Sequence, residues 1–244
     1  MMDEHRDSVG VDLSEKGRPV GGIPTSFNSR LFVQLQAFGA CRDVGPIVHQ
    51  LEASGVGGAL YEDVNDPYGI ALVTFSEDAG HFVGRVRELL GTAPFRELEF
   101  KPEYSMLGRT YALGYEADLS DALIDRPKKR ISSPELRWAV WYPLRRAGAF
   151  ALLSEKEQQQ ILAEHGAIGH AFGKAGHGYD IRLACHGLGK EDNDFVIGLL
   201  GAELFPLSAI VQRMRSTRQT SQYLTHLGPF FVGRAVWQSV GNHR

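Results

Sequence analysis

The pattern of apolar and polar positions predicts a regular succession of strands and helices from Leu31 onwards. Short runs rich in β-branched and aromatic residues predict strands, and a three-to-four residue apolar spacing predicts helices. The predicted elements are a strand over Leu31 to Phe38, a helix over Asp43 to Ala53, strands over Gly58 to Asp63 and Tyr68 to Phe75, a helix over about Ala79 to Leu90 and a strand over Phe95 to Phe100.

The same order recurs in the second half of the chain. The predicted elements are a strand over Arg137 to Tyr142, a helix over Ser154 to His165, strands over Tyr179 to Cys185 and Phe195 to Leu200, a long helix from about Leu207 to Arg215 or beyond, and a strand over Phe230 to Gly233. Ser154 and Glu157 have the spacing of a capping box at the start of the first helix, and Gly166 can end it.

Two β-α-β-β-α-β units predict an α+β protein made of two ferredoxin-like halves. Helices cover one face of each half-sheet, and pairing of the two sheets would cover the other faces. We expect the halves at residues 27–115 and 134–238, joined by a polar linker at 116–133. Residues 1–26 are polar and rich in glycine and proline, which predicts a loose tail.

Composition narrows the class of protein. The chain has 244 residues, 43% of them hydrophobic, so it can bury a substantial core. Its formal net charge of −3 argues against nucleic-acid binding. Cys41 and Cys185 are too far apart to indicate a zinc finger or a disulfide framework. No signal peptide or membrane-length apolar run is evident, so we expect a cytoplasmic protein.

Candidate chemistry lies in the second half. His165 ends a predicted helix, where a neutral imidazole is a good iron ligand, and where a histidine also commonly interacts with the last carbonyl groups. Tyr142 precedes a proline at a strand end, as a redox group or as an ordinary strand residue. The neighbouring Arg145 and Arg146 could pair with carboxylates or be solvated.

Two further segments carry polar groups. The helix that ends near Arg215 leads into a polar, basic stretch that includes Ser221, suited either to an anionic ligand or to a solvated helix end. Arg182 and His186 share one face of a predicted strand, which looks into a pocket or into water. Phosphate-binding loops, the dinucleotide fingerprint and the HExxH motif are absent from the sequence.

Taken together, these segments resemble the chlorite dismutase-like family. The similarity covers about residues 30–238 and is strongest from Trp138 to Gln238. Its motifs are Trp-Tyr-Pro-Leu-Arg-Arg (141–146), Leu-Leu-Ser-Glu-Lys-Glu (152–157), Glu-His-Gly-Ala-Ile-Gly (164–169), Glu-Asp-Asn-Asp-Phe (191–195), Met-Arg (214–215) and Leu-Gly-Pro-Phe-Phe-Val-Gly (227–233). The resemblance implies a dimeric α+β barrel within one chain, heme or coproheme in the C-terminal half, and a homo-oligomer, often a pentamer.

The resemblance also implies roles for single residues. His165 matches the proximal iron ligand, and Tyr142-Pro143 matches the radical tyrosine of the coproheme decarboxylase branch. Asp180 stands at or near the distal position, with Arg182 two residues on as the second catalytic candidate. The cofactor-binding candidates are Arg145, Arg146, Phe150, Arg215 and Ser221. Where the decarboxylases carry a Trp and a Tyr after the Tyr-Pro pair, this chain has only Phe150.

Three functions follow from the resemblance. The first is peroxide-dependent oxidative decarboxylation of iron-coproporphyrin III to heme b. The second is conversion of chlorite to chloride and dioxygen on a permanent heme b. The third is heme binding or sensing without catalysis. Tyr142 favours the first over the second, because true chlorite dismutases carry an aliphatic residue there. Because the Trp and Tyr of the decarboxylases are missing, heme binding without catalysis stays an alternative.

Overall fold

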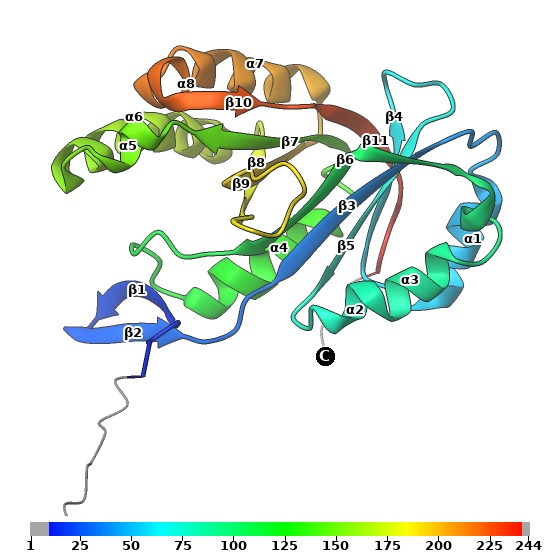
Figure 1. The fold of residues 1–244 in the computed structure, drawn as a ribbon, viewed down its shortest axis with the longest axis horizontal. Helices are drawn as coiled ribbons and strands as arrows, with labels where there is room; N and C mark the ends of the chain where they lie inside the picture. The colour runs from blue at the N-terminus through cyan, green and yellow to red at the C-terminus, as the bar shows by residue number, and fades with distance from the viewer. Residues whose placement is uncertain (1–9, 241–244) are drawn as a thin grey trace, which may run out of the picture.

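The protein is built around one continuous antiparallel sheet that closes into a barrel (Figure 1). The structure, a computed structural model, describes residues 10–240. Around the barrel the strands follow the order β7-β11-β4-β5-β3-β6-β8-β9, and β9 pairs again with β7. Strand β10 extends the sheet beside the end of β7. The predicted α+β class is confirmed.

The first half supplies four strands of the barrel. Its elements are β3 (Phe32–Gly39), α1 (Gly45–Ser54), β4 (Gly58–Asp63), β5 (Ile70–Ser76), α2 (Gly80–Val83), α3 (Arg85–Leu90), the 3₁₀ turn η1 (Phe95–Glu97) and β6 (Glu99–Thr110). The helix predicted over 79–90 is divided at Gly84, whose backbone leaves the helical region. The strand predicted over 95–100 begins only at Glu99, because Pro94 starts a turn before it, and it continues to Thr110.

The second half repeats the order with longer helices. Its elements are β7 (Trp138–Arg146), α5 (Gly148–Ala151), α6 (Glu155–Lys174), β8 (Tyr179–Ala184), β9 (Phe195–Gly201), α7 (Leu204–Arg215), α8 (Arg218–Tyr223), β10 (Leu224–Leu227) and β11 (Phe231–Gln238). The capping box of Ser154 and Glu157 is confirmed. Gly166 does not end α6, which continues to Lys174, because a single glycine weakens a helix without interrupting its hydrogen bonds.

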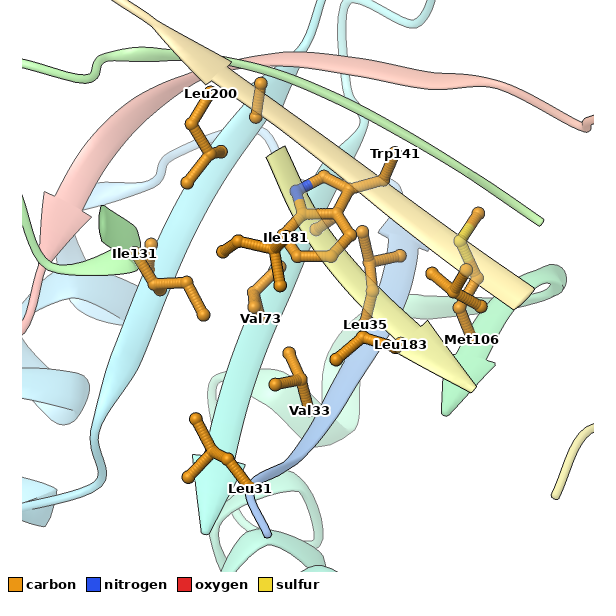
Figure 2. Close-up of a cluster of buried hydrophobic side chains, with 14 of the residues drawn as sticks. Leu31, Val33, Leu35, Val73, Met106, Ile131, Trp141, Ile181, Leu183 and Leu200 are labelled. Atoms are coloured by element: carbon orange, nitrogen blue, oxygen red, sulfur yellow. The ribbon is translucent and has the colours of Figure 1, made fainter. Parts of the chain in front are cut away.

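The two halves join edge to edge as well as through their inner faces. Strand β4 pairs with β11, and β6 pairs with β8, so each half-sheet satisfies edge groups of the other. Every second residue then points into a common interior. Figure 2 shows Trp141, Val73, Leu35 and Ile181, from four different strands, pointing toward one another there. This interior is a packed core, so ligand space must lie outside the barrel.

Two segments outside the repeats are more ordered than the sequence predicts. Most of the predicted tail from residue 15 onwards forms the hairpin of β1 (Glu15–Val20) and β2 (Ile23–Phe27), whereas residues 1–9 lie outside the described part of the chain. The Glu15 carboxylate anchors this hairpin by accepting hydrogen bonds from Arg109 at 3.2 Å and from the backbone N–H of Ala112 at 2.9 Å.

The predicted linker is largely helical. It contains the short π-helix η2 (Asp121–Asp125) followed by α4 (Arg126–Ile131). Leu123 and Ile131 are buried against the barrel core, which explains why this polar segment is folded. Over residues 10–240, none of the helices has the length and apolar character that crossing a membrane requires.

Candidate functional site

A cavity of about 560 Å³ lies between helices α6 and α7 and the outer face of the second half-sheet. In Figure 1 this is the side of the barrel covered by α6, α7 and α8. Strand alternation directs the side chains. Trp141 points into the barrel core, while Tyr142 and Leu144 point outward into the cavity. The volume of the cavity falls within the usual range for small-molecule and cofactor sites.

His165 lines the helical wall of this cavity, near the middle of α6. Burial lowers the pKa of its imidazole, and the positive charge of Arg146 adds to the effect, so the ring is neutral at pH 7. Its Nδ1 lies 3.2 Å from the hydroxyl of Thr217. A neutral imidazole at a cavity wall could act as a ligand to a metal ion inside the cavity.

A row of glycines keeps the same wall open. Gly166, Gly169 and Gly173 line the cavity from α6, and Gly169 and Gly173 follow His165 at intervals of about one helical turn. A Cβ atom added at Gly166 would meet nothing within 4 Å, and one at Gly169 would meet only the Met214 methyl group at 3.7 Å. Side chains are therefore missing from the helix where a flat ligand would need room beside the histidine.

Tyr142 lines the sheet wall from β7 and is 7% exposed. Its ring stacks on Phe230, with centroids 4.6 Å apart and planes 27° from parallel. Burial raises the pKa of its phenol far above the usual value, and the negative charge of Asp180 contributes. The phenol therefore keeps its proton at any physiological pH.

Asp180 and Arg182 line the cavity from β8, and their side chains form an ion pair in which Arg182 Nε lies 3.2 Å from a carboxylate oxygen. Arg182 also donates to the hydroxyl of Tyr115 at 3.3 Å. Arg130 approaches the same carboxylate at 3.8 Å and donates to the Asp180 backbone carbonyl at 2.6 Å. A hydrogen-bonded cluster of two guanidinium groups and one carboxylate therefore faces the cavity.

The cavity is strongly cationic. Four arginines line it, Arg126, Arg130, Arg182 and Arg215, together with Lys174, whereas Asp180 is the single acidic residue of its described lining. Arg126 and Arg130 are not among the residues predicted from the sequence, since they come from the predicted linker and lie four residues apart on α4. The basic run 126–130 was the available signal, and its helical spacing would have placed both on one face.

The structure places four other predicted site residues outside the cavity lining. Arg145 lies on the face of β7 opposite to Tyr142, because alternate side chains of a strand point to opposite faces, and its Nε donates to the backbone carbonyl of Asp192 at 2.7 Å. Arg146 faces the same way as Tyr142, but two aromatic rings enclose its guanidinium at 4.6 Å each.

One of these rings is Phe150, which is buried beneath Arg146 and contacts Tyr223 edge-to-face. Its side chain is therefore occupied in packing between α5 and α8. Ser221 donates to the Thr217 carbonyl at 2.8 Å within α8, so its hydroxyl is satisfied locally. Tyr142, His165, Arg182 and Arg215 are the predicted residues that the fold brings together in one cavity.

The fold is a closed α+β barrel, and the half-buried His165 lines a cavity on the outside of that barrel. The family model for chlorite dismutase matches residues 70–236, so the chain belongs to the chlorite dismutase family. No curated protein sequence matches the chain.

Solved structures share this fold. A heme-binding protein from Thermus thermophilus is 17% identical, with a TM-score of 0.65 over 85% of this chain and 92% of that one. The chlorite dismutase of Candidatus Nitrospira defluvii in complex with imidazole is 12% identical, with a TM-score of 0.63 over 86% of this chain and 92% of that one.

Proposed function

We propose that the protein binds an iron porphyrin in the α6 cavity, with His165 as the proximal ligand, and that its substrate is iron-coproporphyrin III. The observation that carries this proposal is the combination of one half-buried neutral imidazole and five cationic side chains around a cavity of about 560 Å³. The other iron ligands would come from the porphyrin. Within residues 10–240 no three histidine, cysteine or acidic side chains gather to hold a metal ion.

The charge of the cavity supports a porphyrin with more than two carboxylates. Coproheme carries four propionates, and guanidinium groups bind carboxylates with two parallel hydrogen bonds. Arg126, Arg130, Arg182 and Arg215 bring guanidinium groups to the cavity from three different elements. Arg126 pairs with Asp121, and Arg130 and Arg182 share Asp180, so a propionate would share or replace these carboxylate partners. The whole chain is acidic, with a net charge of −3, so the concentration of positive charge belongs to this cavity and not to the protein surface in general.

The proposed reaction balances with hydrogen peroxide as oxidant. One propionate, one peroxide and one proton give one vinyl group, one carbon dioxide and two water molecules, so each propionate loses two electrons. Conversion to heme b therefore consumes two peroxide molecules. The iron porphyrin supplies the redox chemistry when bound, and the protein's contribution is to position groups around it.

Tyr142 is proposed as the hydrogen-abstracting residue. Its buried phenol keeps its proton in the resting protein. Loss of one electron and that proton converts the phenol into a neutral radical, which then takes a hydrogen atom from a propionate carbon. The propionate radical would then lose carbon dioxide and one more electron, leaving the vinyl group, and the peroxide consumed accounts for both electrons. The Phe230 ring holds the Tyr142 ring in place, and the burial of Tyr142 limits competing reactions with solvent. Arg182 and Asp180 would orient the peroxide on the sheet side of the cavity.

Chlorite conversion to chloride and dioxygen is the second candidate, and Arg182 is the observation that favours it. A guanidinium facing the cavity can hold a small oxyanion. Tyr142 weighs against this reading, because the chlorite-converting members carry an aliphatic residue there. Binding without catalysis is the third candidate. It is favoured by the packing of Phe150 beneath Arg146, away from the cavity.

One titration separates the three candidates. Apoprotein is titrated with coproheme and with heme b, and each complex is then treated with peroxide or with chlorite. We expect tighter binding of coproheme, and product masses after peroxide that fall by the mass of one and then two formic acid equivalents per porphyrin. Dioxygen release from chlorite would instead establish the second candidate. A His165→Ala variant with the wild-type absorption spectrum would refute the proximal ligand.

By resemblance to the same family, whose members are often pentamers, we propose that the protein is a homo-oligomer. Light scattering on the purified protein measures the assembly mass directly, and a monomer at micromolar concentration would contradict the proposal.

A further inference from the structure

The imidazole of His165 is within hydrogen-bonding distance of the hydroxyl of a buried threonine, Thr217. Thr217 is 2% exposed and precedes the first turn of α8, where its hydroxyl oxygen accepts from the backbone N–H of Thr220. The same oxygen lies 3.2 Å from His165 Nδ1 and 2.7 Å from the backbone carbonyl of Met214. One side chain therefore joins the end of α7, the start of α8 and the middle of α6.

The direction of these hydrogen bonds follows from the chemistry of the three groups. A backbone carbonyl only accepts, so the short contact with Met214 uses the single proton of the Thr217 hydroxyl. The hydroxyl then has only lone pairs to offer His165. The hydrogen bond between the two side chains therefore requires that Nδ1 carries the imidazole proton.

We infer that Thr217 is a positioning residue that holds His165 in the tautomer with Nδ1 protonated and Nε2 free to bind iron. This inference rests on the proposed porphyrin function and concerns the same site. His165 lines the cavity, and its two ring nitrogens point in divergent directions. Anchoring Nδ1 on the Thr217 hydroxyl therefore turns Nε2 away from that hydroxyl and leaves it free to bind a metal.

The charge of the group that accepts the Nδ1 hydrogen bond influences how strongly His165 donates electrons to iron. A carboxylate partner would pull the Nδ1 proton and make the imidazole a stronger donor to iron, which favours the oxidised metal. A threonine hydroxyl has no such charge. The neighbouring acid, Glu164, accepts from the backbone N–H of Arg218 at 3.3 Å. The hydrogen bond from His165 Nδ1 is thus accepted by a neutral hydroxyl. We therefore expect His165 to donate less electron density to iron, and the bound iron to have a higher reduction potential, than with a carboxylate partner.

Three substitutions test the inference. Thr217→Val removes the acceptor and the cap of α8 together. Thr217→Ser keeps both. Thr217→Asp keeps a side chain that caps helices well and replaces the neutral acceptor by a charged one. Two measurements are made on each variant: the protonation of the His165 ring nitrogens in the apoprotein by proton–nitrogen correlation NMR, and the reduction potential of the hemin complex by spectroelectrochemistry.

The expected results differ between variants. Wild type, Thr217→Ser and Thr217→Asp keep the proton on Nδ1, and Thr217→Val shifts it toward Nε2 and binds hemin about tenfold more weakly. The reduction potential falls in Thr217→Asp and stays near wild type in Thr217→Ser. An unchanged tautomer in Thr217→Val, or equal potentials in wild type and Thr217→Asp, would overturn the inference. If hemin binds to none of the proteins, the proposed function fails while the apoprotein spectra still decide the role of Thr217.

Discussion

The indole of Trp141 occupies the space that Gly198 leaves on the neighbouring strand inside the barrel. The two residues are direct partners in the pairing of β7 with β9. A Cβ atom at Gly198 would lie 2.5 Å from Cη2 of the indole, which is closer than real atoms approach. Tyr142 follows Trp141 in β7, and its side chain lies on the opposite face of the sheet. The fit between Trp141 and Gly198 therefore helps to set the position of the cavity wall.

Gly198→Ala is expected to destabilise the protein by about 1–3 kcal/mol, because the added methyl group overpacks a filled core. Urea denaturation of the apoprotein measures the change in the free energy of unfolding. Gly189→Ala is the matched control, since a Cβ there meets nothing within 4 Å, and it should change stability little. Equal stability of the two variants would show that the indole shifts without cost.

Gly166 offers the opposite case, a glycine with open space in front of it. Gly166→Ala is expected to stabilise the apoprotein by roughly 0.5–1 kcal/mol, because alanine favours helix over glycine. Gly166→Leu is expected to place a large side chain beside His165 and weaken hemin binding. Thermal unfolding and hemin titration measure the two effects. Wild-type hemin affinity in Gly166→Leu would mean that the ligand does not lie along this face of α6.

Tyr142→Phe is expected to keep coproheme binding and to abolish decarboxylation, because the ring remains stacked on Phe230 while the abstractable phenol hydrogen is lost. Mass spectrometry of the porphyrin after peroxide addition measures the product. Tyr223→Phe is the control, since that ring packs on Phe150 outside the cavity lining. Unchanged conversion to the divinyl product in Tyr142→Phe would remove the proposed role of this residue.

A comparison of Arg215 with Arg145 separates the effect of charge inside the cavity from that of charge outside it. Arg215 lines the cavity, whereas Arg145 reaches backbone carbonyls at residues 191 and 192. Arg215→Gln is expected to weaken coproheme binding about tenfold, as expected from losing one charge-assisted hydrogen bond. Arg145→Gln should leave the affinity unchanged. Fluorescence-quenching titrations of the two variants provide the comparison, and equal losses would contradict the placement of these side chains.

The stability of the apoprotein should fall in mildly acid solution. Burial lowers the pKa of His165 from its ordinary value of 6.5, and burial acts in the same direction on His81. Below about pH 6.5 the unfolded chain therefore binds protons that the folded protein does not, so the free energy of unfolding decreases as the pH falls toward the lowered pKa values.

Urea denaturation between about pH 7.5 and about pH 5.5 measures this slope. His165→Gln should show a shallower slope, and the part that remains should belong to His81 and other titrating groups. An identical slope in wild type and variant would mean that His165 titrates alike in the folded and unfolded protein.

Local sequence signals determined the elements that carry the site. The capping box at Ser154 sets the start of α6, and the alternation along β7 sends Trp141 inward and Tyr142 outward. These features depend on neighbours within a few residues, so they can be read without the fold. The motifs around Tyr142 and His165 also carried the family resemblance, which the match over residues 70–236 confirms.

Only the tertiary structure decided how distant segments meet. Strand β4 pairs with β11 and β6 pairs with β8, in each case from the other half of the chain. The sequence of one strand does not indicate which distant strand it will pair with. Arg130 enters the cavity because α4 packs beside β8, whereas Arg145 leaves it because its strand face points the other way. Burial and partner choice depend on contacts far apart in the chain, and only the folded barrel determines those contacts.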